Sequence, residues 1–193
     1  RRVEPSTLEE AAKITASGLL RGARGNSGVI LSLLFRGMSK VFKGLAEADG
    51  AQLAAAMQEG VTTAYGAVMK PAEGTVLTVS RLAAQRALEA AGEQNSAEYV
   101  LDEAIKTGYS TLAETIEMNP VLKKAGVVDA GGKGWLLALE AMMCALKGED
   151  VVAPEGGAAG EVKEQADFSD FNTEDITFTY CTEFIISREN QND

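Results

Sequence analysis

A glycine-rich segment, residues 22–28, has the composition of a phosphate-binding turn. It reads GARGNSG and lies between two apolar, helix-like stretches. Its glycines allow positive φ and close approach of a ligand to the backbone, and Asn26 or Ser27 can cap a helix running from about residue 29 to 42. Unpaired N–H groups and the positive end of a helix dipole suit a phosphate. A tight, well-capped helix–helix turn has the same composition, and the segment is neither a Gly-x-Gly-x-x-Gly motif nor a P-loop.

Two further polar turns contain glycine, at residues 70–75 and 129–134. In an antiparallel bundle, turns separated by an even number of helices lie at the same end, so the three turns are expected to meet there. Such a cluster predicts a nucleotide pocket in which Asn26, Ser27 and Thr75 donate to phosphates. Asp129 would bind a ribose or order its own turn. Taken singly, each residue also fits a structural role, with Thr75 and Asp129 as helix caps.

The absence of certain residue types and motifs excludes several kinds of catalytic and metal-binding site. The chain has no histidine, which removes histidine-based triads and histidine metal ligands. Cys144 and Cys181 do not have the spacing of a metal or redox motif. Phosphoryl transfer needs a metal held by carboxylates, but no turn carries a compact Asp-x-Asp arrangement. No catalytic residue and no metal ligand can therefore be assigned from the sequence.

The elements that position these turns are predicted to be helices. A capping box with Ser6 as N-cap and Glu9 three residues later predicts a helix to about Arg21. Apolar residues recur at helical spacing in the following segments. The expected fold is an all-α, antiparallel up-and-down helical bundle or barrel of six or seven helices over residues 1–148. The remaining helices are expected at about 29–42, 53–68, 76–91, 96–118 and 135–146.

The last 45 residues differ in character from the first 148. Residues 149–174 are acidic and rich in glycine and alanine, which is typical of a flexible linker. Within residues 175–193, Ile176, Phe178 and Tyr180 alternate with polar residues, so we expect one β-strand that begins a following domain. The chain is interpreted as an excerpt from a longer polypeptide, with a trimmed complete protein as the alternative.

Charge limits the classes of partner. The formal net charge is −10 and the sequence pI is about 4.6. This argues against general nucleic-acid binding, which needs a basic face. Neither a membrane-spanning run nor an export signal is visible. With two cysteines and no such signal, a cytoplasmic location is expected.

Three motifs together resemble the kinase domain of bacterial fatty acid kinase, a member of the DhaL-like family of dihydroxyacetone kinase nucleotide-binding domains. They are LRGARGNSGVILS at 20–32, MKPAEGT at 69–75 and AGVVDAGGKG at 125–134. The resemblance covers roughly residues 6–148, and residues 180–184 look like the start of that kinase's middle domain. It implies an antiparallel helical barrel that binds ATP and Mg²⁺ at one end. The implied nucleotide-binding residues are Gly25, Asn26, Ser27, Gly28, Thr75, Asp129 and Gly131.

The resemblance implies that a fatty acid carboxylate, presented by a separate fatty-acid-binding protein, is phosphorylated to an acyl phosphate. The family's magnesium ligands lie in an Asp-rich turn that is expected upstream of residue 1, so the excerpt alone is expected to be inactive. Two alternatives stay open: the nucleotide subunit of a dihydroxyacetone kinase, and a non-catalytic helical scaffold. A homodimer also stays open.

Overall fold

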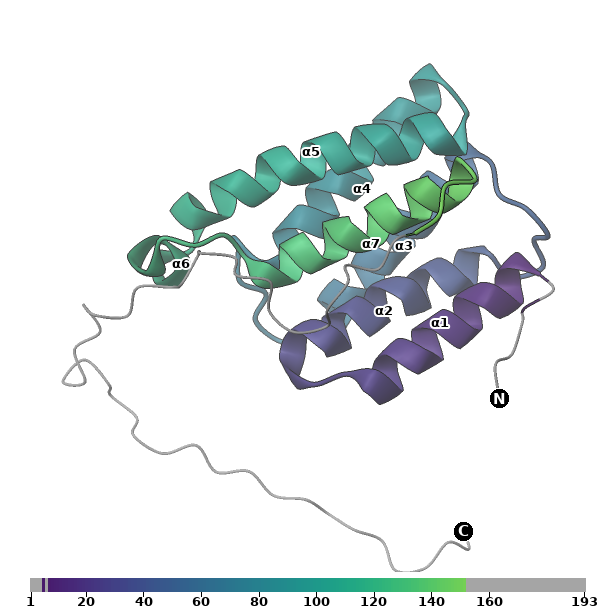
Figure 1. The fold of residues 1–193 in the computed structure, drawn as a ribbon. Coiled ribbons are helices and arrows are strands. Elements are labelled where there is room, and N and C mark those ends of the chain that lie inside the picture. Colours follow the sequence, from purple (N-terminus) through teal and green to yellow (C-terminus); the bar gives the residue numbers. More distant parts are fainter. Residues whose placement is uncertain (1–4, 6, 152–193) are drawn as a thin grey trace, which may run out of the picture.

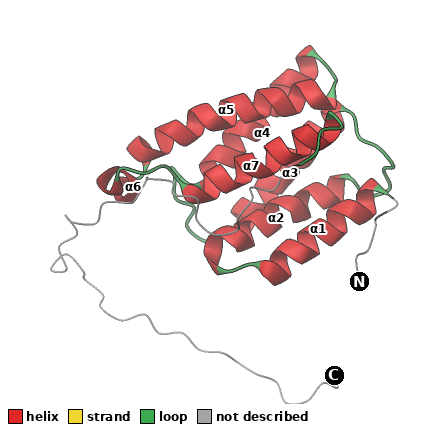
Figure 2. Ribbon diagram, in the orientation of Figure 1, coloured by secondary structure: helices red, strands yellow, loops and turns green. Residues whose placement is uncertain are grey.

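The computed structural model describes residue 5 and residues 7–151, and every regular element in this part of the chain is a helix (Figures 1 and 2). The all-α prediction is therefore confirmed. The predicted linker beyond residue 151 and the predicted strand at 175–193 lie outside the described residues, so the domain boundaries stay predictions. The helices are α1 (Leu8–Gly22), α2 (Gly25–Val41), α3 (Gly50–Ala67), α4 (Val76–Glu93), α5 (Ala97–Met118), α6 (Pro120–Ala125) and α7 (Ala130–Leu146).

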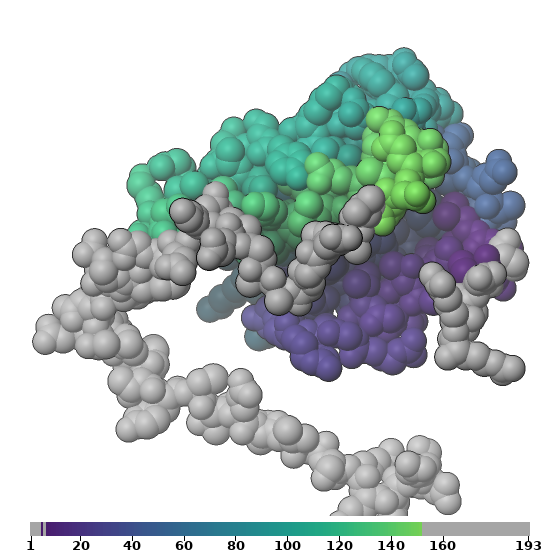
Figure 3. Space-filling model, viewed as in Figure 1, coloured from purple at the N-terminus to yellow at the C-terminus, as the bar shows by residue number. Residues whose placement is uncertain are grey.

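The long helices form an up-and-down array. Each of α1 to α5 packs against its neighbour in sequence, and α7 packs mainly on α4 and α5. Figure 1 shows α7 lying in front of α3 and α4, between α5 and α2. Side chains fill the space between α5 and α7 on the face drawn in Figure 3. Short connections enforce the antiparallel order, as the sequence predicts.

The core combines small residues with a few large ones. Buried alanines of α4, including Ala83 and Ala87, let α3, α5 and α7 approach closely, and Trp135 and Leu136 of α7 fill the remaining space. Helices α2 and α3 are closer still: a Cβ added to Gly37 would lie 2.4 Å from the Glu59 carbonyl oxygen. A side chain there would force the two helices apart.

The helix N-termini fall into two groups. Five are capped by a side chain that accepts a backbone N–H: those of α1, α3, α5, α6 and α7. The other two, α2 and α4, begin after Arg24 and Thr75, and neither side chain makes a capping hydrogen bond. Both of these termini belong to glycine-containing turns.

Two predicted caps are wrong. Thr7 rather than Ser6 caps α1, accepting from the Glu10 N–H at 3.2 Å. Helix α2 begins at Gly25, four residues earlier than predicted, so Asn26 and Ser27 lie inside its first turn and cannot be its N-cap. The sequence pattern missed this start because glycine, asparagine and serine have low helix propensity.

No helix in the described part of the chain combines the length and the apolarity needed to cross a bilayer.

Candidate functional site

The three glycine-containing turns meet at one end of the bundle, as predicted. In Figure 1, α2, α4 and α7 all begin at the end where α1, α3 and α5 finish. The closest approach is at Gly131. A methyl group placed on Gly131 would lie 3.3 Å from Ser27 Oγ, 3.2 Å from Asp129 Oδ2 and 3.3 Å from Val76 Cβ. Because Gly131 has no side chain, the first turns of α2, α4 and α7 pack closely together around it, and we call this junction the Gly131 cradle.

Asp129 orders one side of this cradle. Its Oδ2 accepts the Gly132 N–H at 2.6 Å, which caps α7, and its own N–H donates to Thr115 Oγ1 at 3.1 Å. Burial raises the pKa of the Asp129 carboxyl, while hydrogen bonds from the backbone N–H groups of Gly132 and Val76 act in the opposite direction. Asp129 therefore links the N-termini of α4 and α7.

The start of α2 presents backbone and side-chain polar groups outward. Gly25 has φ of +76°, a left-handed conformation that side chains other than glycine rarely adopt. A Cβ on Gly28 would lie 3.1 Å from Ala23 Cα, so this turn is tight. The Asn26 and Ser27 side chains are exposed and are not used as caps. Both remain available to a ligand.

The second turn is held in place by its own hydrogen bonds. Thr75 occupies the predicted N-cap position of α4, but its hydroxyl donates to the Ala72 carbonyl oxygen at 2.8 Å instead of accepting from the helix. Gly74 is buried with φ of +72°, and a Cβ there would lie 2.9 Å from Met118 Cβ and 3.0 Å from Asn119 Cβ. The turn is therefore pressed against the end of α5.

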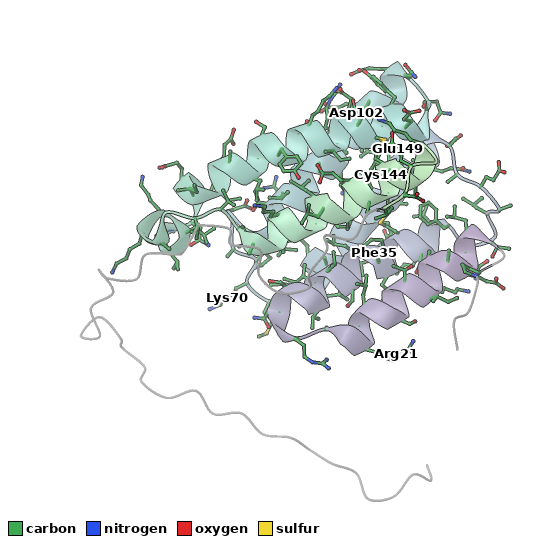
Figure 4. The ribbon with its side chains drawn as sticks, viewed as in Figure 1. Arg21, Phe35, Lys70, Asp102, Cys144 and Glu149 are labelled. Carbon is green, nitrogen blue, oxygen red and sulfur yellow. The ribbon has the colours of Figure 1, made fainter. Side chains whose placement is uncertain are left out.

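Positive charge gathers on the connections and helix ends around this end of the bundle, although the chain as a whole is acidic. Figure 4 labels two of the residues, Arg21 on α1 and Lys70 on the α3–α4 turn. The basic residues there are Arg21, Arg24, Lys70, Lys123, Lys124 and Lys133, and the carboxylates of Glu73 and Glu117 lie at the same end, where Glu117 pairs with Lys123. The N–H groups at the start of α2, which has no side-chain cap, favour an anionic ligand.

The described residues do not by themselves fit a magnesium site. Within them, no three of the side chains histidine, cysteine, aspartate and glutamate lie close enough together to hold a metal ion. Asp129 is the carboxylate at the cradle, and it already accepts two backbone N–H groups.

One buried polar atom lies one turn into α7. Trp135 is 2% exposed, and its indole Nε1 has no hydrogen-bond partner in the described part of the chain. Its ring meets Phe35 of α2 edge-to-face, with ring centroids 5.7 Å apart. This contact joins α2 and α7, two of the three helices whose first turns form the cradle.

Sequence reasoning missed two groups at this site. Thr115 lies on α5, far along the chain from any glycine motif, and periodicity reads it as a core position. The second is a hydrogen-bonded set around Arg81 that ties down the second turn. The sequence signal that could have indicated this set is Arg81, a basic residue in the predicted helix that follows the turn containing Glu73.

The fold and these turns define an all-α domain whose three glycine-containing turns meet at one end. A family model described as the DAK2 domain matches residues 1–144. The chain therefore belongs to the DAK2 domain family, the dihydroxyacetone kinase-like nucleotide-binding family, which is associated with kinase function.

Relatives of known sequence are similar over most of the chain. An uncharacterized protein of Staphylococcus saprophyticus is 44% identical over 182 residues, and uncharacterized proteins of Staphylococcus aureus strains USA300 and COL are 46% identical over the same length. The matched region is 93% of this chain and 33% of each relative. The chain thus spans about one third of the length of these curated relatives.

Proposed function

We propose that this chain is the nucleotide-binding part of an ATP-dependent kinase that phosphorylates a protein-bound fatty acid carboxylate to an acyl phosphate. The observation that carries the nucleotide site is the meeting of the first turns of α2, α4 and α7 at Gly131, where the N-terminus of α2 has no side-chain cap. The N-terminus of α4 lacks a cap from Thr75, and its Val76 N–H donates to Asp129 instead.

In this proposal, different residues bind different parts of the nucleotide. Backbone N–H groups of Gly25 to Gly28 and the side chains of Asn26 and Ser27 bind the terminal phosphates, and Thr75 binds from the second turn. Asp129 and Gly131 shape the space toward the nucleoside. Hydrogen-bond donors fixed in place before binding cost little to reorganise when charge develops during transfer.

In the proposed reaction, a carboxylate oxygen of the fatty acid attacks the γ-phosphorus of ATP. The bond from that phosphorus to the bridging oxygen breaks, and ADP leaves with the electron pair. Mg²⁺, when bound, would neutralise charge on the phosphates. We expect its ligands outside the described residues.

Two points support a fatty acid over dihydroxyacetone as the substrate. The three motifs resemble the fatty acid kinase domain, and the relatives are about three times as long as the matched region. A stand-alone ketose-kinase subunit would end near α7. A separate fatty-acid-binding protein is then the partner that delivers the substrate, and the cytoplasm is the proposed location.

The test uses the full-length protein that contains this chain. It is incubated with ATP, Mg²⁺ and a fatty acid loaded on a fatty-acid-binding protein, and acyl phosphate is trapped as the hydroxamate. Parallel reactions contain dihydroxyacetone instead. Acyl phosphate formation supports the proposal, whereas phosphorylation of dihydroxyacetone alone supports the ketose-kinase alternative. Absence of ATP binding by calorimetry would support the scaffold alternative.

A further inference from the structure

A chain of hydrogen bonds runs from α3 through α4 to the second glycine-containing turn. The Arg81 Nε–H donates to the Tyr65 hydroxyl at 3.1 Å, and Arg81 Nη2 donates to Glu73 Oε2 at 2.9 Å. The same Glu73 oxygen accepts from Thr78 Oγ1 at 2.8 Å, and Thr78 Oγ1 accepts the Gly74 N–H at 2.9 Å. We call these four side chains, Tyr65, Glu73, Thr78 and Arg81, the turn brace.

The side chains of the turn brace differ in how far they are exposed to solvent. Thr78 is 1% exposed, whereas the Glu73 and Arg81 side chains are 57% and 39% exposed. The hydrogen bond to Tyr65, together with the nearby Glu73 carboxylate, raises the pKa of Arg81 above its ordinary value. An exposed ion pair alone contributes little to stability. Here the pair acts through Thr78, whose hydroxyl is buried and bonded on both sides.

The turn that the brace holds has little freedom of its own. Gly74 has φ of +72° and lies against Met118 and Asn119, and Thr75 follows directly. The Thr75 hydroxyl is bonded back to the Ala72 carbonyl within the same turn. Any movement of Glu73 or of the Gly74 N–H therefore shifts Thr75 and the first N–H groups of α4.

We propose that Arg81 is a positioning residue for nucleotide binding, which sets Thr75 and the α4 N-terminus through Glu73 and Thr78. This inference rests on the proposed nucleotide site. Arg81 does not touch the Gly131 cradle itself; its effect passes through the second turn. A guanidinium is required because it bonds Tyr65 and Glu73 from separate nitrogens at once.

The test measures ATP affinity by calorimetry on the full-length protein. The loss of one charge-assisted brace predicts that Arg81→Gln raises the Kd for ATP roughly tenfold. Arg81→Lys keeps the charge and can still reach Glu73, but it cannot bond both partners. Its Kd for ATP is therefore expected to lie between that of the parent and that of Arg81→Gln. The matched control is Arg86→Gln on the same helix. Arg86 pairs with Glu93 and Glu103 away from the three turns, with its side chain only 22% exposed.

A coupling measurement separates positioning from general destabilisation. If Arg81 acts through the second turn, Arg81→Gln causes a smaller further loss of affinity in a Thr75→Ala background than in the parent but keeps its full effect in a Ser27→Ala background. Equal Kd values for Arg81→Gln and the parent would overturn the inference while leaving the nucleotide site intact. Equal losses for Arg81→Gln and Arg86→Gln would also overturn it. Failure of the parent to bind ATP would instead reject the proposed function.

Discussion

The substitution Gly131→Ala tests whether Gly131 serves folding or ligand binding. The added methyl group would meet Ser27 Oγ, Asp129 Oδ2 and Val76 Cβ at 3.2 to 3.3 Å, so each neighbour must move by only a few tenths of an ångström. Alanine also favours the helix by up to about 1 kcal/mol over glycine. We therefore expect the free energy of unfolding to change by less than about 1 kcal/mol, because this gain and the crowding roughly cancel.

Ligand binding should respond more strongly, because the methyl group displaces Ser27 and Asp129, which are proposed to contact the nucleotide. Misaligning one or two such hydrogen bonds costs about 1–3 kcal/mol, so the Kd for ATP is expected to rise roughly tenfold to a hundredfold. The assay is calorimetric titration of the full-length protein with ATP, together with thermal melts of the same samples without ligand.

Two neighbouring glycines on α7 provide controls. Gly134 has no atom within 4 Å of an added Cβ, so Gly134→Ala should stabilise the fold slightly and leave ATP affinity unchanged. At Gly132 the Cβ would lie 2.8 Å from Val79 Cγ2 in the core, so Gly132→Ala should lower the melting temperature. Parental ATP affinity in Gly131→Ala would refute the assignment of the cradle to the ligand.

Three further outcomes are expected. Ser27→Ala should lower turnover on the order of 10²-fold with little change in melting temperature, since Ser27 is not a cap; equal turnover would reject its phosphate role. Hydrogen bonds from Arg86 and Tyr99 lower the pKa of Glu93 from 4.5 to about 2, so this stabilisation is present above pH 4.5 and lost toward pH 2. Arg86→Gln should therefore melt lower at neutral pH and match the parent near pH 2; a constant gap across that range would contradict the pairing. The 193-residue chain alone should form no acyl phosphate with ATP and Mg²⁺, because the resemblance implies that an Asp-rich turn holds the magnesium and the sequence contains no Asp-x-Asp arrangement; activity equal to that of the full-length protein would redirect the search to Glu73 and Asp129.

The fold was predictable because apolar periodicity and turn residues agree along most of the chain. Helical stripes, the Asp49-Gly50 and Asn119-Pro120 breaks and the short connections together specify an antiparallel array, and the parity of its turns brings the three glycine motifs to one end. The start of α2 was misplaced because Gly25 to Gly28 favour a turn locally, while packing against α1 and α3 extends the helix over them.

The meeting of the three turns at one end of the bundle was predictable from the sequence, but the contacts between them were not. Ser27, Asp129 and Gly131 do converge, yet the capping roles differ: Asp129 caps α7, whereas Ser27 and the Thr75 side chain cap nothing. Such details depend on side-chain rotamers and on neighbours distant in sequence, such as Thr115 and Arg81. No local spacing encodes those partners.

The uncapped N-terminus of α2 also carries an energetic consequence. A side-chain cap contributes about 1 kcal/mol, so the start of α2 lacks a stabilisation that the capped helices of the described domain have. An anion that supplied the missing acceptors would return that free energy on binding, and occupancy would then tighten the same end of the bundle that receives the ligand. Ligand binding would thus raise the free energy of unfolding and stabilise the junction of α2, α4 and α7 as a single unit.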